Sequence, residues 1–152
     1  MPKLDTTAPT DLLIKLLERQ QALVEQLADL ADRQAALIDA ADTDGLLAVL
    51  GQRQGIMDQF TAGQDSLARL TEAARREGAT DPAMQQRIGA LIEDITNRLA
   101  QIMRLDEKDR TVLGASRDRV GEALTGLSVA KEARRTYLRA RTVNNRFSDR
   151  HG

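Results

Sequence analysis

Cysteine and tryptophan are absent from this 152-residue chain, and aromatic residues make up only 2% of it. Without cysteine there is no disulfide framework, no thiolate zinc site and no thiol nucleophile. Because apolar residues still amount to 41%, the core has to be built from leucine, isoleucine, valine, alanine and methionine. Such a core is typical of a thin helical bundle rather than of an enzyme with a deep pocket.

Long hydrophobic runs are also missing. No stretch approaches 18 consecutive apolar residues, so we expect no helix that inserts into a membrane. The segment Met1–Thr10 carries no apolar run and therefore lacks the pattern of a signal peptide. These two features predict a cytoplasmic protein.

Patterns for catalysis or metal binding are equally scarce. The single histidine, His151, is next to last, and the phosphate-loop, zinc-protease and nucleophile-elbow motifs are absent. Asp106 and Asp109 share one helix face, but two carboxylates on a straight helix form a poor cage for a hard cation. We therefore expect no enzyme activity, no metal and no cofactor, with both aspartates solvated or paired with Lys108 and Arg110.

What the chain has in abundance is helical periodicity. Between Ile88 and Tyr137, stripe residues recur at alternating spacings of 4 and 3, which is typical of a coiled-coil seam. The stripe consists of Ile88, Ile92, Ile95, Leu99, Ile102, Asp106, Asp109, Leu113, Ser116, Val120, Ala123, Leu127, Ala130, Arg134 and Tyr137. It predicts one long helix over about 82–140. The rest of the chain must cover this helix, because a single helix cannot bury its own stripe.

Two further helices are predicted before it, over about 11–41 and 44–77. The first carries two adjacent apolar rows, which indicates more than one neighbour. Gln20 and Gln34 occupy stripe positions in it, where they either fix the register as buried polar groups or lie at a solvated edge. The second has Arg53 in its stripe and three internal glycines, which weaken it without tertiary support.

Local signals mark the ends of these helices. Thr10 is the expected N-cap of the first helix. The segment Asp42–Gly45 offers N-cap side chains and a flexible glycine, which predicts a tight turn or a sharp kink. Gly78 suits the left-handed position after a helix, Asp81 an N-cap and Pro82 the first helical position. Because this second connection is short, we expect the helices that it joins to be antiparallel neighbours.

These patterns predict an all-α protein, an elongated antiparallel hairpin or bundle of three or four long helices with coiled-coil-like packing. Residues 1–141 are expected to form a single helical domain, and 142–152 a flexible polar tail without a helical pattern. The residues predicted to be buried together are Leu27, Leu30, Ile92, Ile95, Leu99 and Ile102.

The net charge is only −1, but it is unevenly spread. Residues 131–152 carry +5, which leaves −6 on the rest. A basic helix end is commonly explained by the helix dipole and by solubility. The functional alternative is docking to an acidic protein surface. We expect no nucleic acid as partner, because the chain is acidic overall and its basic end offers only Tyr137 and Phe147 for stacking.

The far end of the long predicted helix is the candidate partner-binding surface. Gly114, Gly121 and Gly126 lower its helical stability and open shallow space that an apolar helix of a partner can fill. In the alternative interpretation, the first helix covers this end and the small residues simply allow close packing. The candidate binding residues are Val120, Leu124, Leu127, Arg134, Tyr137, Leu138 and Phe147.

The order of certain residues also carries a resemblance. A Leu-Leu pair with glutamine repeats is followed by a second Leu-Leu pair with an arginine and an apolar pair, and then by a long helix that ends in tyrosine. These residues are Leu16, Leu17, Gln20, Gln21, Gln26, Gln34, Leu46, Leu47, Arg53, Ile56, Met57, Leu105, Asp106, Asp109, Leu113, Arg117, Leu124, Leu127 and Tyr137. With its closing segment Arg146–Gly152, the chain resembles the bacterial flagellar type III export chaperones of the FlgN and FliT kind.

The resemblance implies a helical chaperone without catalytic residues. Such a protein binds late flagellar structural subunits, the hook–filament junction or filament-cap proteins, through their terminal helices before export. Where FlgN-like chains tend to have an Asn pair, Asp106 and Asp109 stand here, which a FliT-like pattern tolerates better. The alternative is a structural coiled-coil scaffold that self-assembles through its apolar stripe. A chaperone is expected to be a monomer or a weak homodimer that gains a protein partner, whereas a scaffold keeps its stoichiometry on dilution.

Overall fold

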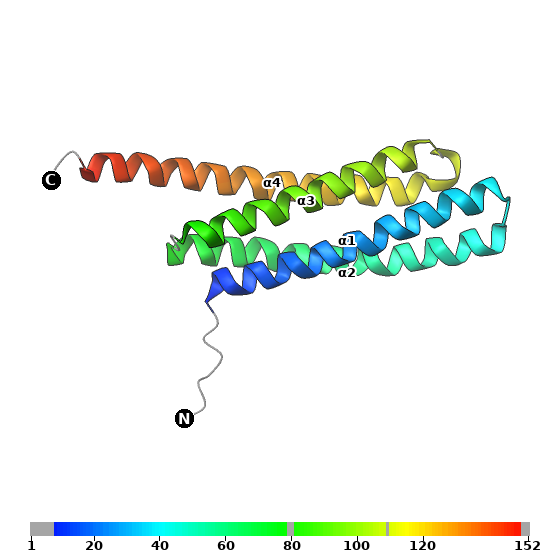
Figure 1. The fold of residues 1–152 in the computed structure, drawn as a ribbon, viewed down its shortest axis with the longest axis horizontal. Helices are drawn as coiled ribbons and strands as arrows, with labels where there is room; N and C mark the ends of the chain where they lie inside the picture. Colours follow the sequence, from blue (N-terminus) through cyan, green and yellow to red (C-terminus); the bar gives the residue numbers. More distant parts are fainter. Residues whose placement is uncertain (1–7, 79–80, 109, 150–152) are drawn as a thin grey trace, which may run out of the picture.

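The computed structural model describes residues 8–78, 81–108 and 110–149. For residues 110–117 and 140–149 it describes the backbone alone. Within these ranges the chain forms four helices and no strand, which confirms the predicted all-α bundle (Figure 1). None of these helices is both long and apolar enough to cross a lipid bilayer. The helices are α1 (Pro9–Asp39), α2 (Thr43–Glu77), α3 (Pro82–Glu107) and α4 (Arg110–Asp149).

The four helices form two antiparallel hairpins that lie side by side. Successive helices run in opposite directions, with α1 and α2 in one hairpin and α3 and α4 in the other (Figure 1). Between the hairpins, α1 packs against α3 and α2 packs against α4. In the described part of the chain α2 and α3 therefore lie on a diagonal, so the prediction that they are neighbours is wrong. The wide apolar face of α1 explains this arrangement, because it needs two helices to cover it.

The prediction of one long helix over 82–140 is also wrong, because the chain reverses direction after Glu107 and continues as α4. The stripe spacing is the same on both sides of the reversal, so the sequence periodicity does not reveal it. Folding back lets the two halves of the stripe cover each other, which a single extended helix does not allow. Asp109 lies outside the described residues. At the other end α4 continues to Asp149, so residues 142–149 are helical rather than an irregular tail.

The predicted turns between helices are confirmed in their local geometry. The Asp42 carboxylate caps α2 by accepting a hydrogen bond from the Gly45 N–H at 2.9 Å. Gly78 follows α2 with φ of 68°, the left-handed conformation that glycine adopts without a steric penalty. The Asp81 carboxylate caps α3 by accepting from the Ala83 N–H at 3.0 Å. Local side-chain chemistry therefore fixes both of these boundaries.

The start of α1 differs from the prediction. The N-cap is Ala8, without a side-chain hydrogen bond, and Pro9 is the first helical residue. Thr10 lies inside the helix, buried, and its hydroxyl donates to the Glu77 carboxylate at 3.5 Å. Proline is well suited to the first helical position because its φ is already helical and it has no N–H to satisfy. The helix consequently begins before the threonine that would have capped it.

The core is aliphatic and matches the predicted set. It contains every residue that the sequence placed there, Leu27, Leu30, Ile92, Ile95, Leu99 and Ile102. Phe60 of α2 is its one fully buried aromatic side chain among the described residues. The core side chains come from all four helices and form one continuous cluster.

A buried ion pair crosses the core between the two hairpins. Arg53 Nη1 donates to Asp106 Oδ1 at 2.9 Å and Nη2 donates to Asp106 Oδ2 at 2.7 Å, with both side chains 1% exposed. Arg53 Nη1 also donates to Gln34 Oε1 at 2.8 Å, so the cluster joins α1, α2 and α3. The expectation that Asp106 is solvated or pairs with Lys108 or Arg110 is therefore wrong. Its carboxylate instead satisfies an arginine that would otherwise be buried without a counter-ion.

Gln20 shows the same use of a buried amide in the α1–α2 hairpin. Its Nε2 donates to the Phe60 backbone oxygen at 2.9 Å. A Cβ atom on Gly63 would lie 2.7 Å from Gln20 Oε1, so glycine is what lets the amide reach the helix backbone. Of the two interpretations of Gln20 and Gln34, the buried one is confirmed for both side chains.

Candidate partner-binding surface

Helix α4 is anchored in the bundle over only part of its length. Among its described side chains, residues 118–139, the buried ones are Val120, Ala123 and Leu127. No described side chain beyond Leu127 is buried, and Figure 1 shows α4 extending past the ends of the other three helices. Over residues 128–139, α4 therefore lies on the bundle as an exposed and partly covered helix.

A shallow groove runs between this part of α4 and the second half of α2. We call it the α2–α4 groove, and its cavity volume is about 380 Å³. Val129 lies in it with 66% of its surface exposed, among the smaller side chains of Gly126, Ala130 and Ala133. The groove is lined by Gln64, Asp65, Leu67, Ala68, Thr71, Glu72, Gly126, Val129, Ala130 and Ala133.

Gln64 fixes how closely α4 approaches α2. Its Nε2 donates to the Ala123 backbone oxygen at 3.0 Å, and a Cβ atom on Gly126 would lie 2.7 Å from that nitrogen. Gly126 thus leaves room for the amide, as Gly63 does for Gln20 on the other side of α2. This contact lies at one end of the groove and sets the width of the groove there.

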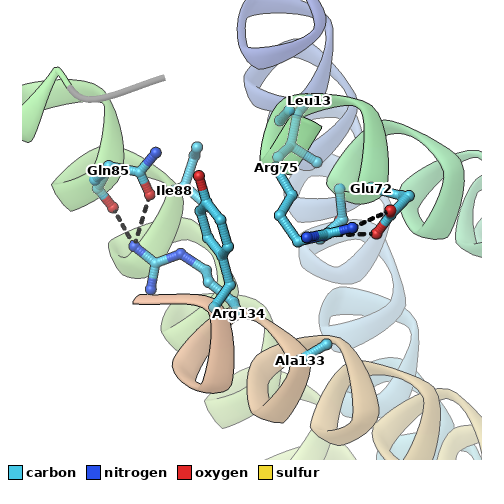
Figure 2. A pocket seen from close by; sticks show the side chains of 10 residues that line it. Leu13, Glu72, Arg75, Gln85, Ile88, Ala133 and Arg134 are labelled. Atoms are coloured by element: carbon cyan, nitrogen blue, oxygen red, sulfur yellow. Dashed lines mark hydrogen bonds and ion pairs between the residues drawn. The ribbon is translucent and has the colours of Figure 1, made fainter. Parts of the chain in front are cut away.

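The groove adjoins a smaller cavity at the end of the bundle, which we call the end pocket. Its volume is about 70 Å³, and all four helices contribute to its wall (Figure 2). Thr71, Glu72 and Ala133 line both the groove and the pocket. The end pocket is lined by Leu13, Thr71, Glu72, Ala74, Arg75, Gln85, Ile88, Ala133, Arg134 and Tyr137.

One side of the end pocket carries a closely paired arginine. Arg75 donates two hydrogen bonds to the Glu72 carboxylate, from Nε at 2.9 Å and from Nη2 at 2.5 Å. Its guanidinium carbon lies 5.8 Å from the centre of the Tyr137 ring, within the range of a cation–π contact. The Arg75 hydrogen bond is the main cause that lowers the pKa of Glu72 to about 2, and Arg76 adds to it. The charge of Arg75 is therefore already compensated.

The other side of the pocket carries an arginine without a carboxylate. Arg134 Nη2 donates to the Gln85 backbone oxygen at 2.7 Å and to Gln85 Oε1 at 3.4 Å (Figure 2). Its Nε is buried without a hydrogen-bond partner within the described part of the chain. Partial burial lowers the pKa of Arg134 from its ordinary value. The pocket thus has an uncompensated cation beside an apolar wall.

The structure separates the sequence-predicted binding residues into three groups. Val120 and Leu127 are fully buried, so the packed bundle does not present them to a partner. Arg134 and Tyr137 both line the end pocket, where the structure brings them together with α2 and α3.

The remaining predicted residues lie along α4 in less defined positions. Leu124 is half-buried beside Met103 and Arg104 of α3, on the opposite side of α4 from Val129. Leu138 is also half-buried, and Phe147 belongs to α4, although its side chain lies outside the described residues.

Sequence reasoning missed Val129 and the α2 side of the surface. Val129 does not belong to the stripe, and the stripe was the pattern that selected candidate residues. A helical projection of α4 would have shown it as an apolar residue among Gly126, Ala130 and Ala133. The contribution of Glu72 and Arg75 depends on the parallel packing of α2 against α4, for which no local sequence signal exists.

The pairing of Glu72 has a measurable consequence. Its pKa in the folded protein is expected at about 2, below the ordinary 4.5, because the Arg75 guanidinium stabilises the carboxylate. The stabilisation is fully present above the unfolded pKa and is lost as the pH falls towards 2. An NMR titration of the Glu72 carboxyl group measures this directly. In the Arg75→Gln variant the titration is expected to move towards the ordinary value, and an unshifted wild-type pKa would contradict the pairing.

The fold is a bundle of four helices around an aliphatic core, and the groove and the end pocket together are its candidate partner-binding surface. No group of three or more potential metal ligands occurs among the described residues. A family model described as FlgN protein matches residues 10–145. The chain therefore belongs to the FlgN family, which is a family of flagellar export chaperones and not of enzymes. Comparisons with curated proteins and with solved structures gave no match.

Proposed function

We propose that this chaperone acts in the cytoplasm on late flagellar structural subunits, the hook–filament junction or filament-cap proteins, and binds their terminal helices before export. The observation that carries the proposal is Val129, 66% exposed in a groove of small side chains beside the unburied part of α4. An exposed apolar surface of this kind is a feature of interaction sites. Membership in a chaperone family favours this function over that of a self-assembling scaffold.

The shape of the groove supports a helix as the bound element. An amphipathic helix binds by laying apolar residues at spacings of 3 and 4 into such a groove. From Gly126 to Ala133 the groove extends over about two helical turns of α4, roughly 12 Å. Beyond Ala133, α4 continues to Asp149, about 24 Å further, and offers a platform for the rest of a client helix.

The sequence-predicted residues take different roles in this proposal. Tyr137 and Leu138 extend the contact surface beyond the groove. Val120 and Leu127 instead pack in the core and hold α4 on the bundle. The exposed Arg139 and its basic neighbours then attract an acidic client or export component, which raises the association rate more than the affinity.

Val129→Glu tests the groove. The substitution places a charge where an apolar client side chain would pack, so affinity for the client is expected to fall at least tenfold, the effect of about 1.4 kcal/mol. Because Val129 is exposed, the melting temperature should stay nearly unchanged. The measurement is calorimetric titration with a purified hook–filament junction protein and, separately, with a filament-cap protein.

Leu47→Glu is the matched control. Leu47 is 62% exposed, lies near the start of α2 at the opposite end of the bundle, and receives the same kind of charge. This variant is expected to bind the client as the wild type does. Equal loss in both variants, or loss only in Leu47→Glu, would place the client elsewhere. Failure of wild-type protein to bind either class of subunit would refute the proposed clients. The proposed stoichiometry, a monomer or weak homodimer that binds one client, is measured by solution mass across a dilution series.

A further inference from the structure

Arg134 is half-buried and, within the described part of the chain, has no acidic partner. Arg53 is paired with Asp106 in the core, and Arg75 with Glu72 at the same end of the bundle. Arg134 Nη2 donates to Gln85, whereas within the described part of the chain Nε is buried without a hydrogen-bond partner. A half-buried cation in this state has charge and donor groups available for an anion.

The surroundings of Arg134 restrict the kind of molecule that can carry this anion. In the end pocket the guanidinium shares one cavity with Leu13, Ile88, Ala133 and Tyr137. The volume of about 70 Å³ lies between the roughly 15 Å³ that holds one water and the roughly 150 Å³ that takes benzene. The cavity therefore suits a single aliphatic side chain. A free inorganic anion would leave the apolar wall uncovered.

We propose that the end pocket binds the carboxyl-terminal residue of a partner chain, an aliphatic residue whose side chain enters the cavity while Arg134 pairs with the α-carboxylate. This inference rests on the proposed function, because it takes the partner to be the exported subunit and names the part of it that the pocket recognises. Carboxylate binding by arginine is commonly bidentate, which fixes orientation as well as charge. The Gln85 backbone oxygen, by holding Nη2, sets the direction in which the guanidinium presents its remaining donors.

A chain terminus fits the pocket better than the flank of a helix. A helix with its side chains is about 10 Å across, whereas all four bundle helices contribute to the wall of this small cavity. The guanidinium and the apolar wall lie in one small cavity, so the bound group needs an anion and an aliphatic side chain close together. Within a polypeptide, only the carboxyl-terminal residue carries both on a single Cα atom. An acidic and an apolar side chain on successive turns of a helix are about 5–6 Å apart instead.

The test uses two small probes on the full-length protein, N-acetyl-L-leucine and N-acetyl-L-leucinamide. The first reproduces a terminal leucine with its carboxylate, and the second has the same shape without the charge. We expect N-acetyl-L-leucine to produce saturable NMR shifts in the methyl groups of Leu13, Ile88 and Ala133. The amide is expected to bind at least tenfold more weakly. Equal binding of the two probes, the same shifts with acetate alone, shifts confined to other residues, or no saturation would each overturn the proposal.

Two variants separate the guanidinium from general electrostatics. Arg134→Gln is expected to lose the preference for the acid over the amide, whereas Arg87→Gln, which removes an exposed charge from α3, should keep it. The acid–amide comparison on the wild type remains decisive even where Arg134→Gln disturbs folding.

The outcome is independent of the client test. If Val129→Glu loses the client while N-acetyl-L-leucine fails to bind, the proposed function stands and the terminal-residue site is wrong. If the probe binds as expected but no late flagellar subunit does, the pocket recognises a chain terminus of another partner and the proposed clients are wrong.

Discussion

Asp106→Ala is expected to lower the free energy of unfolding by about 3–5 kcal/mol, because it leaves Arg53 as an uncompensated charge in the core. Both side chains are 1% exposed, so water does not reach the guanidinium. Gln34 remains as an acceptor, but a neutral amide does not replace a bidentate carboxylate. For a chain of this length the melting temperature should fall by on the order of 10 °C. Urea unfolding followed by circular dichroism measures the free energy directly.

Two further variants show whether the buried charge is the cause. The double variant Arg53→Met with Asp106→Leu removes both charges and is expected to be near neutral or stabilising. Asp58→Ala breaks the surface ion pair between Asp58 and Arg119. The Asp58 side chain is 63% exposed, so the loss should cost about 0–1 kcal/mol. If the double variant is as unstable as Asp106→Ala, the loss comes from packing and the ion pair is not its source.

Leu99→Ala is expected to cost about 2–5 kcal/mol, the range for truncating a fully buried leucine. Leu99 is 0% exposed and belongs to α3, which packs against both α1 and α4. The lost methyl groups leave a cavity that three helices have to close together, so the upper half of this range is expected. Thermal and denaturant unfolding measure the effect.

Leu47→Ala serves as the comparison for that truncation. It removes the same atoms from a side chain that is 62% exposed and should change stability by no more than about 0.5 kcal/mol. Similar costs at the two positions would mean that Leu99 is not in the core, and the packing of the stripe described here would then be wrong.

The largest part of the fold follows from local sequence signals. The caps at Asp42 and Asp81 and the left-handed Gly78 act within three residues of themselves, so they can be recognised without knowledge of the neighbours. The burial of Ile95 and Leu99 likewise follows from helical spacing, because only one face of an amphipathic helix is apolar. Apart from the closing segment Arg146–Gly152, the residues quoted for the family resemblance lie within the matched range 10–145, and the family is confirmed.

The proposed binding surface was predictable only in part. The sequence indicated the C-terminal half of α4 as the region and included Arg134 and Tyr137, which do lie together in the end pocket. It also included Val120 and Leu127, which are buried, because stripe spacing cannot distinguish a residue that faces the core from one that faces a partner. Val129 was missed for the complementary reason, since it lies off the stripe.

By itself, then, the sequence determined that this protein is helical, where two of its three turns lie and which face of each helix is apolar, because these depend on periodicity and capping within a few residues. Only the tertiary structure decided the reversal after Glu107 and the diagonal placement of α2 and α3. The stripe continues unchanged through that reversal. The Asp106 carboxylate finds its partner on Arg53, 53 residues earlier in the chain. A contact of that separation depends on how whole helices pack, which local spacing does not specify.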